Sequence, residues 1–556
     1  MQKLSTVLMV MLLTIFVFST SGNDLLANVF ASRLQILNPD SSEFDGDLSD
    51  GSGALFTFIL NDTASSVSID IIDVVSGLSV HQIEAGAMSR GANQAIWDGT
   101  GSETGKDYVY KIMAEQPNRS TTDWIMFYDS GPADIYTRGV AIFNDQMDPN
   151  FGLIYASNDA GPLRTGILVY NSDGSRHDPF LVAADAGDGG SFDYGTEAPL
   201  FAILDTRGRL YVTMQGLGKI ARINRDYSVQ VVIEGLTQPK GLYLEGEGED
   251  FTIYVAADNK VLRAKVGTAD TFLAGSMEVV GEFTDFYPHQ IILDDDGALY
   301  ATLRASNDLG SDGKGIRKYD ISGNLPVKDA DASWFLYEAE TFIANDLLLD
   351  HGDDPETSSD DILYYCTRAG ANNDQDGIWR VDDINSSFPS IIRIITEDSF
   401  YGGDENIQAR ATMDFDAAGN IVLMENANEH IFFISPPGEG ETNSFTTTSA
   451  DTFTVDVSSA LEIVSDQIPG EFRLETNYPN PFNPSTVIAF NIPTSGYVTL
   501  EVFNALGQKV KTLVGKNLAP GSYQVEFDGR NLTSGTYFYQ LRAGEFSDVR
   551  KMTLTK

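Results

Sequence analysis

The sequence has 556 residues, of which 42% are hydrophobic, so the chain is long enough to fold into several domains with packed cores. Glycine is abundant, with 51 residues, and long stretches of helical periodicity are nearly absent, which favours an all-β fold class. Residues 1–471 contain 27 Lys and Arg against 74 Asp and Glu, whereas residues 472–556 contain 9 against 6. The strong negative charge of residues 1–471 would repel phosphate groups, which argues against nucleic acid and anionic membranes as partners.

The first 22 residues have the layout of a secretory signal peptide. Lys3 supplies a positive charge, Val7–Phe18 is an apolar run interrupted only by Thr14, and small residues follow up to Gly22. The apolar run is short compared with the roughly 20 residues that span a membrane, which argues against the alternative of an N-terminal anchor. No later stretch is apolar enough to span, so we expect no membrane span in the mature chain.

Residues 33–116 predict a small β-sandwich. Apolar residues alternate with polar ones over V-S-I-D-I-I-D-V-V (67–75), which indicates strands with one buried face. A tight turn is predicted at Asp98-Gly99, and a last strand at Y-V-Y-K-I-M-A (108–114). The pattern resembles the immunoglobulin-like (Ig-like) domain of flagellar hook-capping proteins, and this resemblance implies a spacer or structural role.

Residues 120–438 contain six loosely repeated units, each a short apolar strand, an acidic or Gly-bearing turn and a second strand. Their spacing, roughly 40 to 65 residues, is typical of propeller blades. The first strands are G-V-A-I-F-N (139–144), L-F-A-I-L-D (200–205), G-L-Y-L-E (241–245), Q-I-I-L-D (290–294), D-L-L-L-D (346–350) and T-M-D-F-D (412–416). W-I-M-F-Y (124–128) precedes the first unit and would close the ring as the outer strand of the last blade. We therefore predict a six-bladed β-propeller, which resembles NHL-repeat and gluconolactonase-like propellers.

In a propeller the first strands of all blades begin near one mouth of the central channel. The residues just before these strands are Arg138, Leu200, Lys240, His289, Asn345 and Ala411, with Arg410 one place away. Arg138, Lys240, His289, Asn345 and Arg410 are therefore candidate ligand-binding residues for an anion such as a carboxylate or an acidic sugar. His289 is also the candidate catalytic acid or base, because its ordinary pKa lies near neutrality. The alternative is that these side chains pair with local Asp and Glu and close the channel.

Calcium is the candidate cofactor, since the predicted loops on that face are rich in Asn and Asp, whose oxygens suit this ion. The candidate metal ligands are Asp185, Asp188, Asp193, Asp374 and Asp376. None of the loops reproduces the EF-hand pattern, and Asn, Asp and Gly are also the usual residues of tight turns. Plain turns therefore stay as one alternative, and an acidic surface adapted to a saline habitat stays as another explanation of the charge.

The sequence favours no class of enzyme. It lacks the H-E-x-x-H, G-x-S-x-G and G-x-x-x-x-G-K motifs. Its single cysteine, Cys366, lies in the apolar run I-L-Y-Y-C-T, which predicts a core residue rather than a nucleophile.

Residues 439–471 begin with a Pro-, Gly-, Ser- and Thr-rich stretch and predict a linker, whose later part F-T-V-D-V (453–457) could add a strand. Residues 472–556 then repeat the alternating pattern of the first sandwich and predict a second Ig-like one. This segment contains N-Y-P-N-P-F-N-P-S-T (477–486), V-T-L-E-V-F-N-A-L-G-Q-K-V (498–510) and K-M-T-L-T-K (551–556).

These motifs, in this order, resemble the type A C-terminal sorting domain of the type IX secretion system of Bacteroidetes and related phyla. The resemblance implies that the type IX translocon recognises this domain and exports the chain through the periplasm. It assigns the recognition to the Asn-Pro-rich motif and to a turn, that is, to Asn480, Pro481, Asn483, Pro484, Gly507 and Gln508.

We therefore expect a secreted or cell-surface protein whose propeller is a ligand-binding or interaction module for extracellular carbohydrate or a surface protein. The alternative is an extracellular propeller enzyme, resembling lactonases or glycan lyases and hydrolases, that acts on a sugar or an acidic carbohydrate.

Overall fold

A computed structural model describes residues 29–48, 53–120, 122–131, 133, 136–158, 165–183, 199–247, 250–266, 272–306, 313–336, 343–352, 357–368, 377–386, 389–396, 412–425, 429–438, 442–455, 462–465, 468–529 and 532–556. Within them every regular element is a β-strand, apart from the 3-10 turns η2 (Ala274–Ser276) and η3 (Asp329–Asp331). No helix in this part of the chain is long and apolar enough to cross a membrane. The chain divides into two compact units, one of Met1–Phe30, Asn61–Thr63 and Glu115–Phe445, the other of Ala31–Leu60, Ala64–Ala114 and Thr446–Lys556.

The described strands of the first unit form six antiparallel sheets, which we number as blades 1 to 6 in chain order. From the innermost strand outwards, blade 1 is β8 (Thr137–Ile142), β9 (Ile154–Asn158), β10 (Gly166–Tyr170) and β11 (Arg176–Val182); blade 2 is β12 (Pro199–Leu204), β13 (Leu210–Met214), β14 (Lys219–Ile223) and β15 (Val229–Glu234), with β19 (Phe272–Leu273) added in parallel; blade 3 is β16 (Pro239–Glu247), β17 (Asp250–Ala257), β18 (Lys260–Val266) and β20 (Glu278–Glu282). Blade 4 is β21 (Tyr287–Leu293), β22 (Leu299–Arg304), β23 (Gly313–Tyr319) and β24 (Trp334–Leu336); blade 5 is β25 (Ile343–Asp350), β26 (Ile362–Arg368), β27 (Gly377–Asp382) and β28 (Ser390–Thr396); blade 6 is β29 (Thr412–Phe415), β30 (Ile421–Glu425), β31 (His430–Ser435) and β7 (Ile125–Asp129).

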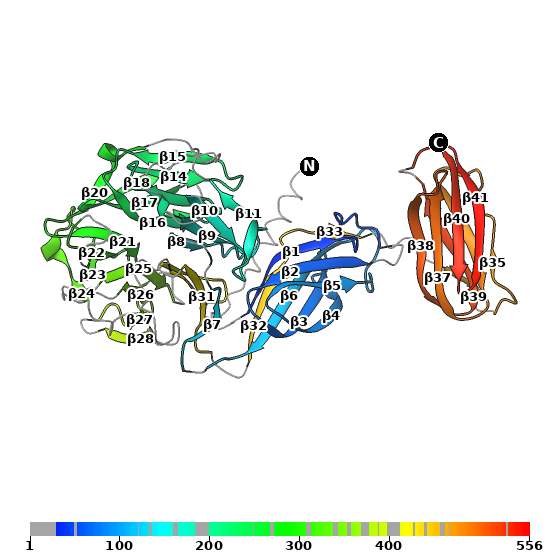
Figure 1. Ribbon diagram of the computed structural model, residues 1–556, viewed down its shortest axis with the longest axis horizontal. Helices are drawn as coiled ribbons and strands as arrows, with labels where there is room; N and C mark the ends of the chain where they lie inside the picture. The colour runs from blue at the N-terminus through cyan, green and yellow to red at the C-terminus, as the bar shows by residue number, and fades with distance from the viewer. Residues whose placement is uncertain are drawn as a thin grey trace, which may run out of the picture. The chain divides into compact units, whose positions relative to one another are not determined.

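The innermost strands contact one another around a ring, in the order β8, β12, β16, β21, β25, β29 and back to β8. Figure 1 labels β8, β16, β21 and β25 near the centre of this ring. Strand β7 closes the ring, because it comes before blade 1 in the chain and pairs with β31 of blade 6. This is the arrangement that the sequence predicts for W-I-M-F-Y (124–128), and it leaves no edge open between the first and last blades.

The blades are held together by hydrophobic cores between neighbours. Side chains of each strand alternate between two cores: along β9, Tyr155 packs toward blade 2, while Ile154 and Ala156 pack toward blade 6. The other neighbouring pairs share cores of the same kind. The second strand of a blade is therefore buried on both faces, which explains why β9, β13 and β30 are buried along their whole length.

Two inner strands, β8 and β16, pass so close to their neighbours near their beginnings that only glycine fits there. A Cβ on Gly241 of β16 would lie 2.6 Å from the carbonyl oxygen of His289 and 2.7 Å from the Cα of Gln290, both in β21. A Cβ on Gly139 of β8 would likewise lie 2.6 Å from the carbonyl oxygen of Leu200 in β12. Both obstacles are backbone atoms, so a larger residue could fit only if a neighbouring strand moved.

The second unit contains two β-sandwiches, each with two antiparallel sheets. The sheets of the first are β1 (Ala31–Leu37), β2 (Ala54–Leu60) and β5 (Gly91–Trp97), and β4 (Ser79–Met88), β3 (Ala64–Asp73), β6 (Asp107–Pro117) and β32 (Thr442–Thr448), with β33 (Phe453–Thr454) also pairing with β6. In chain order the propeller is thus an insertion between β6 and β32. The sequence predicts a linker over 439–471 with a possible strand at 453–457, where β33 lies. Strand β32 was not predicted, because pairing with a strand more than 300 residues earlier leaves no local signal.

The second sandwich, which we call the sorting sandwich, follows the chain to its end. Its sheets are β34 (Glu462–Ser465), β39 (Gly521–Asp528), β36 (Ser485–Ile492) and β35 (Arg473–Leu474), and β38 (Lys509–Leu518), β37 (Gly496–Asn504), β40 (Gly535–Ala543) and β41 (Phe546–Leu554). Alternate side chains of these strands form one core that includes Phe490, Val502, Phe527 and Tyr539. The all-β fold class, with its two sandwiches and its propeller, therefore agrees with the sequence prediction.

Candidate functional site

The residues predicted at the channel mouth lie at the beginnings of the inner strands, as expected, but most of them are buried. The exposed fraction is zero for Lys240, 8% for His289 and 5% for Asn345, whereas Arg138 is half-buried. Leu200 is also buried. The remaining two, Arg410 and Ala411, lie outside the described residues.

The buried members of this group pack against other parts of the ring. The His289 ring meets Phe201 of β12 edge to face, with centroids 5.1 Å apart, although β12 and β21 are not neighbouring inner strands. Asn345 accepts a hydrogen bond of 3.1 Å from Arg304, which is 1% exposed. These side chains are therefore packed inside the ring rather than exposed to a ligand, and the anion-binding mouth stays a prediction.

The ring also buries carboxylates that the sequence analysis missed. Asp346 of β25 accepts hydrogen bonds from Gln290, Thr412 and the backbone nitrogen of Met413 at 2.8 to 3.0 Å, and burial raises its pKa. Burial also raises the pKa of Asp414 in β29, to about 7. The sequence signal was available: both acids stand inside short apolar strands, where an unpaired charge would be unfavourable.

At the opposite end of the channel, where the inner strands end, a pocket of about 390 Å³ opens between blades 5 and 6. We call it the blade 5–6 pocket. It is lined by Trp124, Asn144, Gln146, Leu349, Asp350, His351, Ile362, Tyr364, Arg380, Phe415, Asp416, Ala417, Gly419, Pro436 and Pro437. Its volume falls in the range typical of small-molecule sites.

One wall of the blade 5–6 pocket is aromatic. Tyr364 meets Trp124 and Phe415 edge to face, with centroids 5.7 and 5.4 Å away. Polar groups stand among these rings: Asn144 donates a 2.8 Å hydrogen bond to the carbonyl oxygen of Phe415, and Arg380 pairs with Asp382 at 2.7 Å. The pocket thus combines apolar faces with amide and guanidinium groups.

Asp416 also lines this pocket, but its carboxylate is engaged by the protein. It accepts hydrogen bonds from the backbone nitrogens of Ala418 and Asn420 and from the side chains of Asn420 and Asn61, at 2.8 to 3.2 Å. Burial nevertheless raises its pKa to about 6. Asp416 therefore has a structural role in the turn that follows β29.

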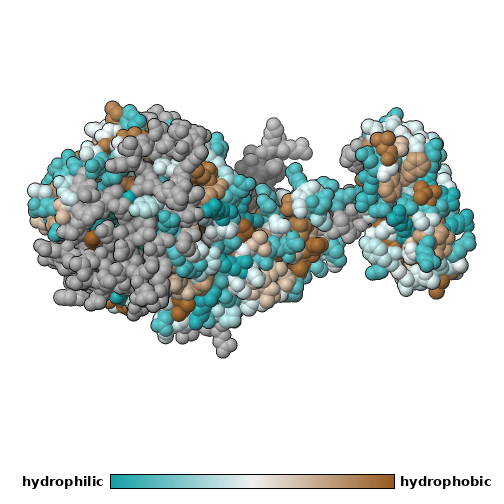
Figure 2. Space-filling model, in the orientation of Figure 1, coloured by the Kyte–Doolittle hydropathy of each residue, from teal (hydrophilic) through white to brown (hydrophobic). Residues whose placement is uncertain are grey.

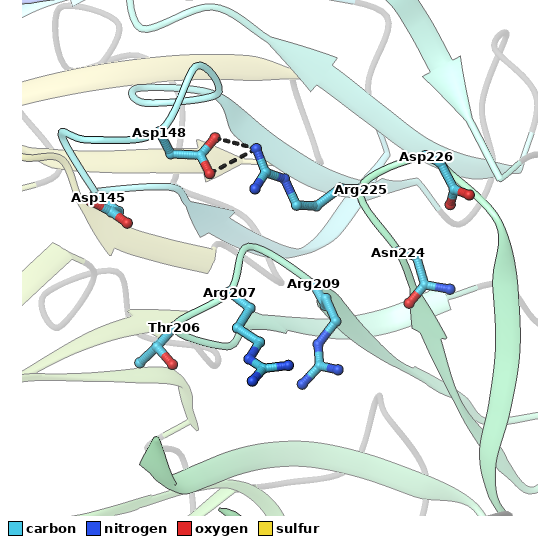
Figure 3. Close-up of a pocket in the computed structure, with 8 residues that line it drawn as sticks. All are labelled: Asp145, Asp148, Thr206, Arg207, Arg209, Asn224, Arg225 and Asp226. Carbon is cyan, nitrogen blue, oxygen red and sulfur yellow. Dashed lines mark hydrogen bonds and ion pairs between the residues drawn. The ribbon is translucent and has the colours of Figure 1, made fainter. Parts of the chain in front are cut away.

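A second, more open pocket of about 630 Å³ lies among turns of blades 1 and 2 (Figure 3). Arg225 reaches across to both carboxylate oxygens of Asp148 at 2.8 Å, while Arg207 and Arg209 extend in a similar direction from one turn. Asp205 anchors that turn by accepting the backbone nitrogens of Arg207 and Arg209 and the Arg209 guanidinium. These ion pairs have an evident role in holding the turns together.

The residues predicted to bind calcium, Asp185, Asp188, Asp193, Asp374 and Asp376, all lie outside the described residues. Among the described ones, a single group of His and carboxylate side chains is close enough to hold a metal ion, namely Asp295, His351 and Asp361. Cys366 is 1% exposed, and burial raises the pKa of its thiol, so the prediction of a core cysteine is confirmed.

The predicted recognition motif lies on the surface of the sorting sandwich. Asn480, Pro481, Asn483 and Pro484 are exposed, and Phe482 between them packs into the core against Phe527. Asn480 accepts the backbone N–H of Thr553 at 3.0 Å and donates to the carbonyl of Lys551. The motif is therefore fixed to β41 while its exposed side chains stay accessible.

The second predicted element is the turn between β37 and β38. Gly507 has a φ of +78° and Gln508 donates its backbone N–H to Asn504 Oδ1 at 3.0 Å. Large apolar side chains accompany both motifs on the surface: Tyr478 is 81% and Leu506 84% exposed. On the face seen in Figure 2, hydrophobic residues of this sandwich are dispersed among hydrophilic ones.

Known proteins resemble different parts of the chain. Residues 476–555 match the family described as secretion system C-terminal sorting domain. No protein of curated function matches the sequence. Similar solved structures include virginiamycin B lyase from Staphylococcus aureus (15% identity, 56% of this chain and all of that one, TM-score 0.34). They also include PorZ, a surface component of the type IX secretion system of Porphyromonas gingivalis (11% identity, 90% of this chain and 74% of that one, TM-score 0.32). A third is the gluconolactonase XC5397 from Xanthomonas campestris (13% identity, 58% of this chain and 97% of that one, TM-score 0.36).

At these identities and TM-scores the solved structures carry no argument about function. The family match does identify a domain, because it covers residues 476–555, where the predicted recognition residues lie. Residues 476–555 are a secretion system C-terminal sorting domain, and the chain is exported by type IX secretion to the cell surface or the extracellular space.

Proposed function

We propose that the exported protein is a binding protein whose propeller holds a neutral, hydroxylated ligand of the carbohydrate class in the blade 5–6 pocket. The observation that carries this proposal is the aromatic wall of Trp124, Tyr364 and Phe415 beside the side chains of Asn144, Gln146 and Arg380.

A sugar ring matches this lining. Its C–H faces can pack on aromatic rings, and its hydroxyl groups can exchange hydrogen bonds with amide and guanidinium side chains. Gln146 is partly exposed at the rim, and Arg380 is partly exposed beside Tyr364. Both side chains can therefore contact a ligand without disturbing the packing of the core.

Charge favours a neutral ligand over an acidic one. The pocket contains Asp350 and Asp416 against the single cation Arg380, whose guanidinium already pairs with Asp382. The acidic body of the protein would also repel an anion at long range. An enzyme acting at the other end of the channel is less well supported, because its candidate acid or base, His289, is 8% exposed and packed on Phe201.

The test is a binding screen of the full-length protein with neutral mono- and oligosaccharides, followed by calorimetry on any hit. The Trp124→Ala variant should bind at least about 10-fold more weakly, because it removes one face of the aromatic wall. Gln146→Ala should have a smaller effect, about 3-fold, since one rim hydrogen bond contributes on the order of 1 kcal/mol.

Tyr497→Ala is the matched control, because Tyr497 is an aromatic residue exposed on the sorting sandwich, far in sequence from the pocket. Equal affinities in wild type and Trp124→Ala would show that the ligand binds elsewhere. If only acidic saccharides bind, the charge argument is wrong and the mouth with Arg138, Lys240 and His289 becomes the better candidate.

A further inference from the structure

Three side chains from blades 4 and 5 converge at the end of the channel where the inner strands end. Asp295 lies in the turn between β21 and β22, His351 directly follows β25, and Asp361 directly precedes β26. Each offers one ligand atom, and the three atoms all lie within 4.8 Å of one another. They form the single group of this kind in the described part of the chain.

One carboxylate oxygen of Asp361 is buried without a hydrogen-bond partner among the described residues, which indicates that another group binds there. This residue is 2% exposed; its Oδ2 accepts the backbone N–H of Asp295 at 3.1 Å, but its buried Oδ1 has no hydrogen-bond partner among the described residues. Asp295 is similar, since its Oδ1 lies 2.6 Å from His351 Nδ1 and its buried Oδ2 has no such partner either. Buried carboxylate oxygens are unfavourable unless something satisfies them.

An ion pair between His351 and Asp295 does not remove this difficulty. Protonated His351 would satisfy one oxygen of Asp295 and leave the other oxygen of Asp295 and Oδ1 of Asp361 buried without a partner. A divalent cation can bind several oxygens at once and offsets two negative charges, so it accounts for all three side chains together.

The segment that carries Asp361 is also held in place by neighbouring groups. Ser358 donates to Asp296 Oδ2, and Asn385 donates to both the carbonyl and the hydroxyl oxygen of Ser358 at 2.8 and 2.7 Å. Asp296 directly follows Asp295 in the blade 4 turn. The two ligand-bearing turns are thus tied together, and such positioning is typical of metal sites.

We propose that Asp295, His351 and Asp361 bind a divalent transition-metal cation, represented here by zinc. One imidazole nitrogen and two carboxylates suit zinc and its neighbours in the first transition series, whereas calcium and magnesium prefer sites made of oxygen alone. Three protein ligands leave a fourth position for water or a ligand. His351 also lines the blade 5–6 pocket, but the metal site is inferred independently of any sugar bound there.

The test uses full-length protein stripped with a chelator and then titrated with zinc in excess calcium, which occupies any sites made of oxygen alone. We expect one tightly bound zinc per chain, and a visible absorption band on cobalt substitution. Asp361→Asn and His351→Gln should each weaken zinc binding at least 10-fold, because each removes one of three ligands.

His430→Gln is the matched control. His430 pairs with Asp129 through the same 2.6 Å contact between Nδ1 and a carboxylate oxygen, but no metal-binding group includes it among the described residues. Its zinc affinity should equal that of the wild type. Far-UV circular dichroism in chelator shows whether each variant is folded, and the His351 side chain is 44% exposed, so its replacement should be tolerated even if Asp361→Asn is not.

Three results would overturn the proposal: no tight zinc in the wild type, an unchanged affinity in His351→Gln, or complete competition by calcium. All of these measurements are made without sugar. The metal site can therefore fail while the carbohydrate proposal stands, and the reverse is equally distinguishable.

Discussion

The propeller and the sorting sandwich are both built from antiparallel strands, but they bury different side chains. Among the described residues of the sorting sandwich, no charged side chain is buried, and the two buried polar side chains, Asn477 and Thr486, hydrogen-bond to each other at 2.9 Å. The propeller buries charged side chains as well, including Lys240, Arg304 and Asp346. A ring brings the beginnings of six strands to one centre, where polar side chains lose contact with water, whereas two stacked sheets have no such centre.

The two regions also differ in charge. Residues 472–556 have nearly equal numbers of acidic and basic residues, while the rest of the chain is strongly acidic. We therefore expect the stability of the propeller to depend on pH, on bound metal and on close packing of the inner strands. The function of the sorting sandwich in export should depend mainly on the geometry of its surface motifs.

Deleting residues 462–556 should have the largest effect, since it removes the sorting sandwich together with its strand β34. We expect export to be lost almost completely, with the rest of the chain retained in the periplasm, as measured by fractionation of the native host. The Trp124→Ala variant, which alters only the propeller, should be exported normally. Normal amounts of the deleted protein outside the cell would contradict the role of this domain.

Gly241→Ala should destabilise the propeller by about 3 kcal/mol, because its new Cβ would collide with backbone atoms of β21. Thermal unfolding of the full-length protein at fixed pH and salt measures the change. Gly323→Ala is the matched control, since no atom lies within 4 Å of the position of its Cβ. Equal melting temperatures for the two variants would show that the inner strands adjust easily.

Asp414 should make the propeller less stable as the pH rises. Its pKa is raised to about 7 in the folded protein, so the folded state holds the proton more tightly than the unfolded chain does. The stabilisation that this proton gives the folded protein is complete below about pH 4 and is lost as the pH rises through about 7.

The Asp414→Asn variant should remove this part of the pH dependence. It should also lose on the order of 1 kcal/mol of stability at every pH, because the two oxygens of Asp414 accept the backbone N–H groups of Ile142 and Phe415 and an amide nitrogen cannot accept either one. Urea unfolding at pH 5 and pH 8 measures both effects. Asp285→Asn is the control for overall charge, because it removes one carboxylate at an exposed position. A parallel shift of both variants would assign the pH dependence to overall charge instead.

Gly507→Ala should have the smallest effect, destabilising the sorting sandwich by about 1 kcal/mol because alanine is strained at a φ of +78°. No atom lies within 4 Å of the position of its Cβ, so we expect no clash. Gly496→Ala, equally open and without a positive φ, is the control. A loss of export without a matching loss of stability would assign the turn to translocon recognition.

The strands of both regions could be predicted from the sequence, because strand alternation and tight turns are local signals. The pattern around 124–128 even predicts the closing strand β7. The sequence analysis missed the buried state of Asp346 and Asp414, although both acids stand within short apolar strands, because the alternation of one strand does not show which acidic side chains neighbouring blades will cover. Their burial depends on neighbouring blades, because Asp346 is hydrogen-bonded to blades 4 and 6 and Asp414 to blade 1.

The candidate sites were harder to predict from the sequence than the strands. Asp295 and His351 are 56 residues apart and belong to different blades, so no spacing motif connects them. Trp124 was predicted only as part of a strand, because an aromatic residue next to a strand has no feature that identifies it as a pocket wall. The order of the blades around the ring, rather than any local pattern, brings these side chains together.

The insertion of the propeller between β6 and β32 has a consequence for proteolytic processing. A protease that cut just after blade 6 would remove β32 and β33 from the first sandwich, together with the sorting sandwich. A cut between Val455 and Glu462 would fall between β33 and β34, the last described strand of the first sandwich and the first described strand of the second. A mature form that lacks its sorting sandwich and remains fully folded should therefore end within this short interval.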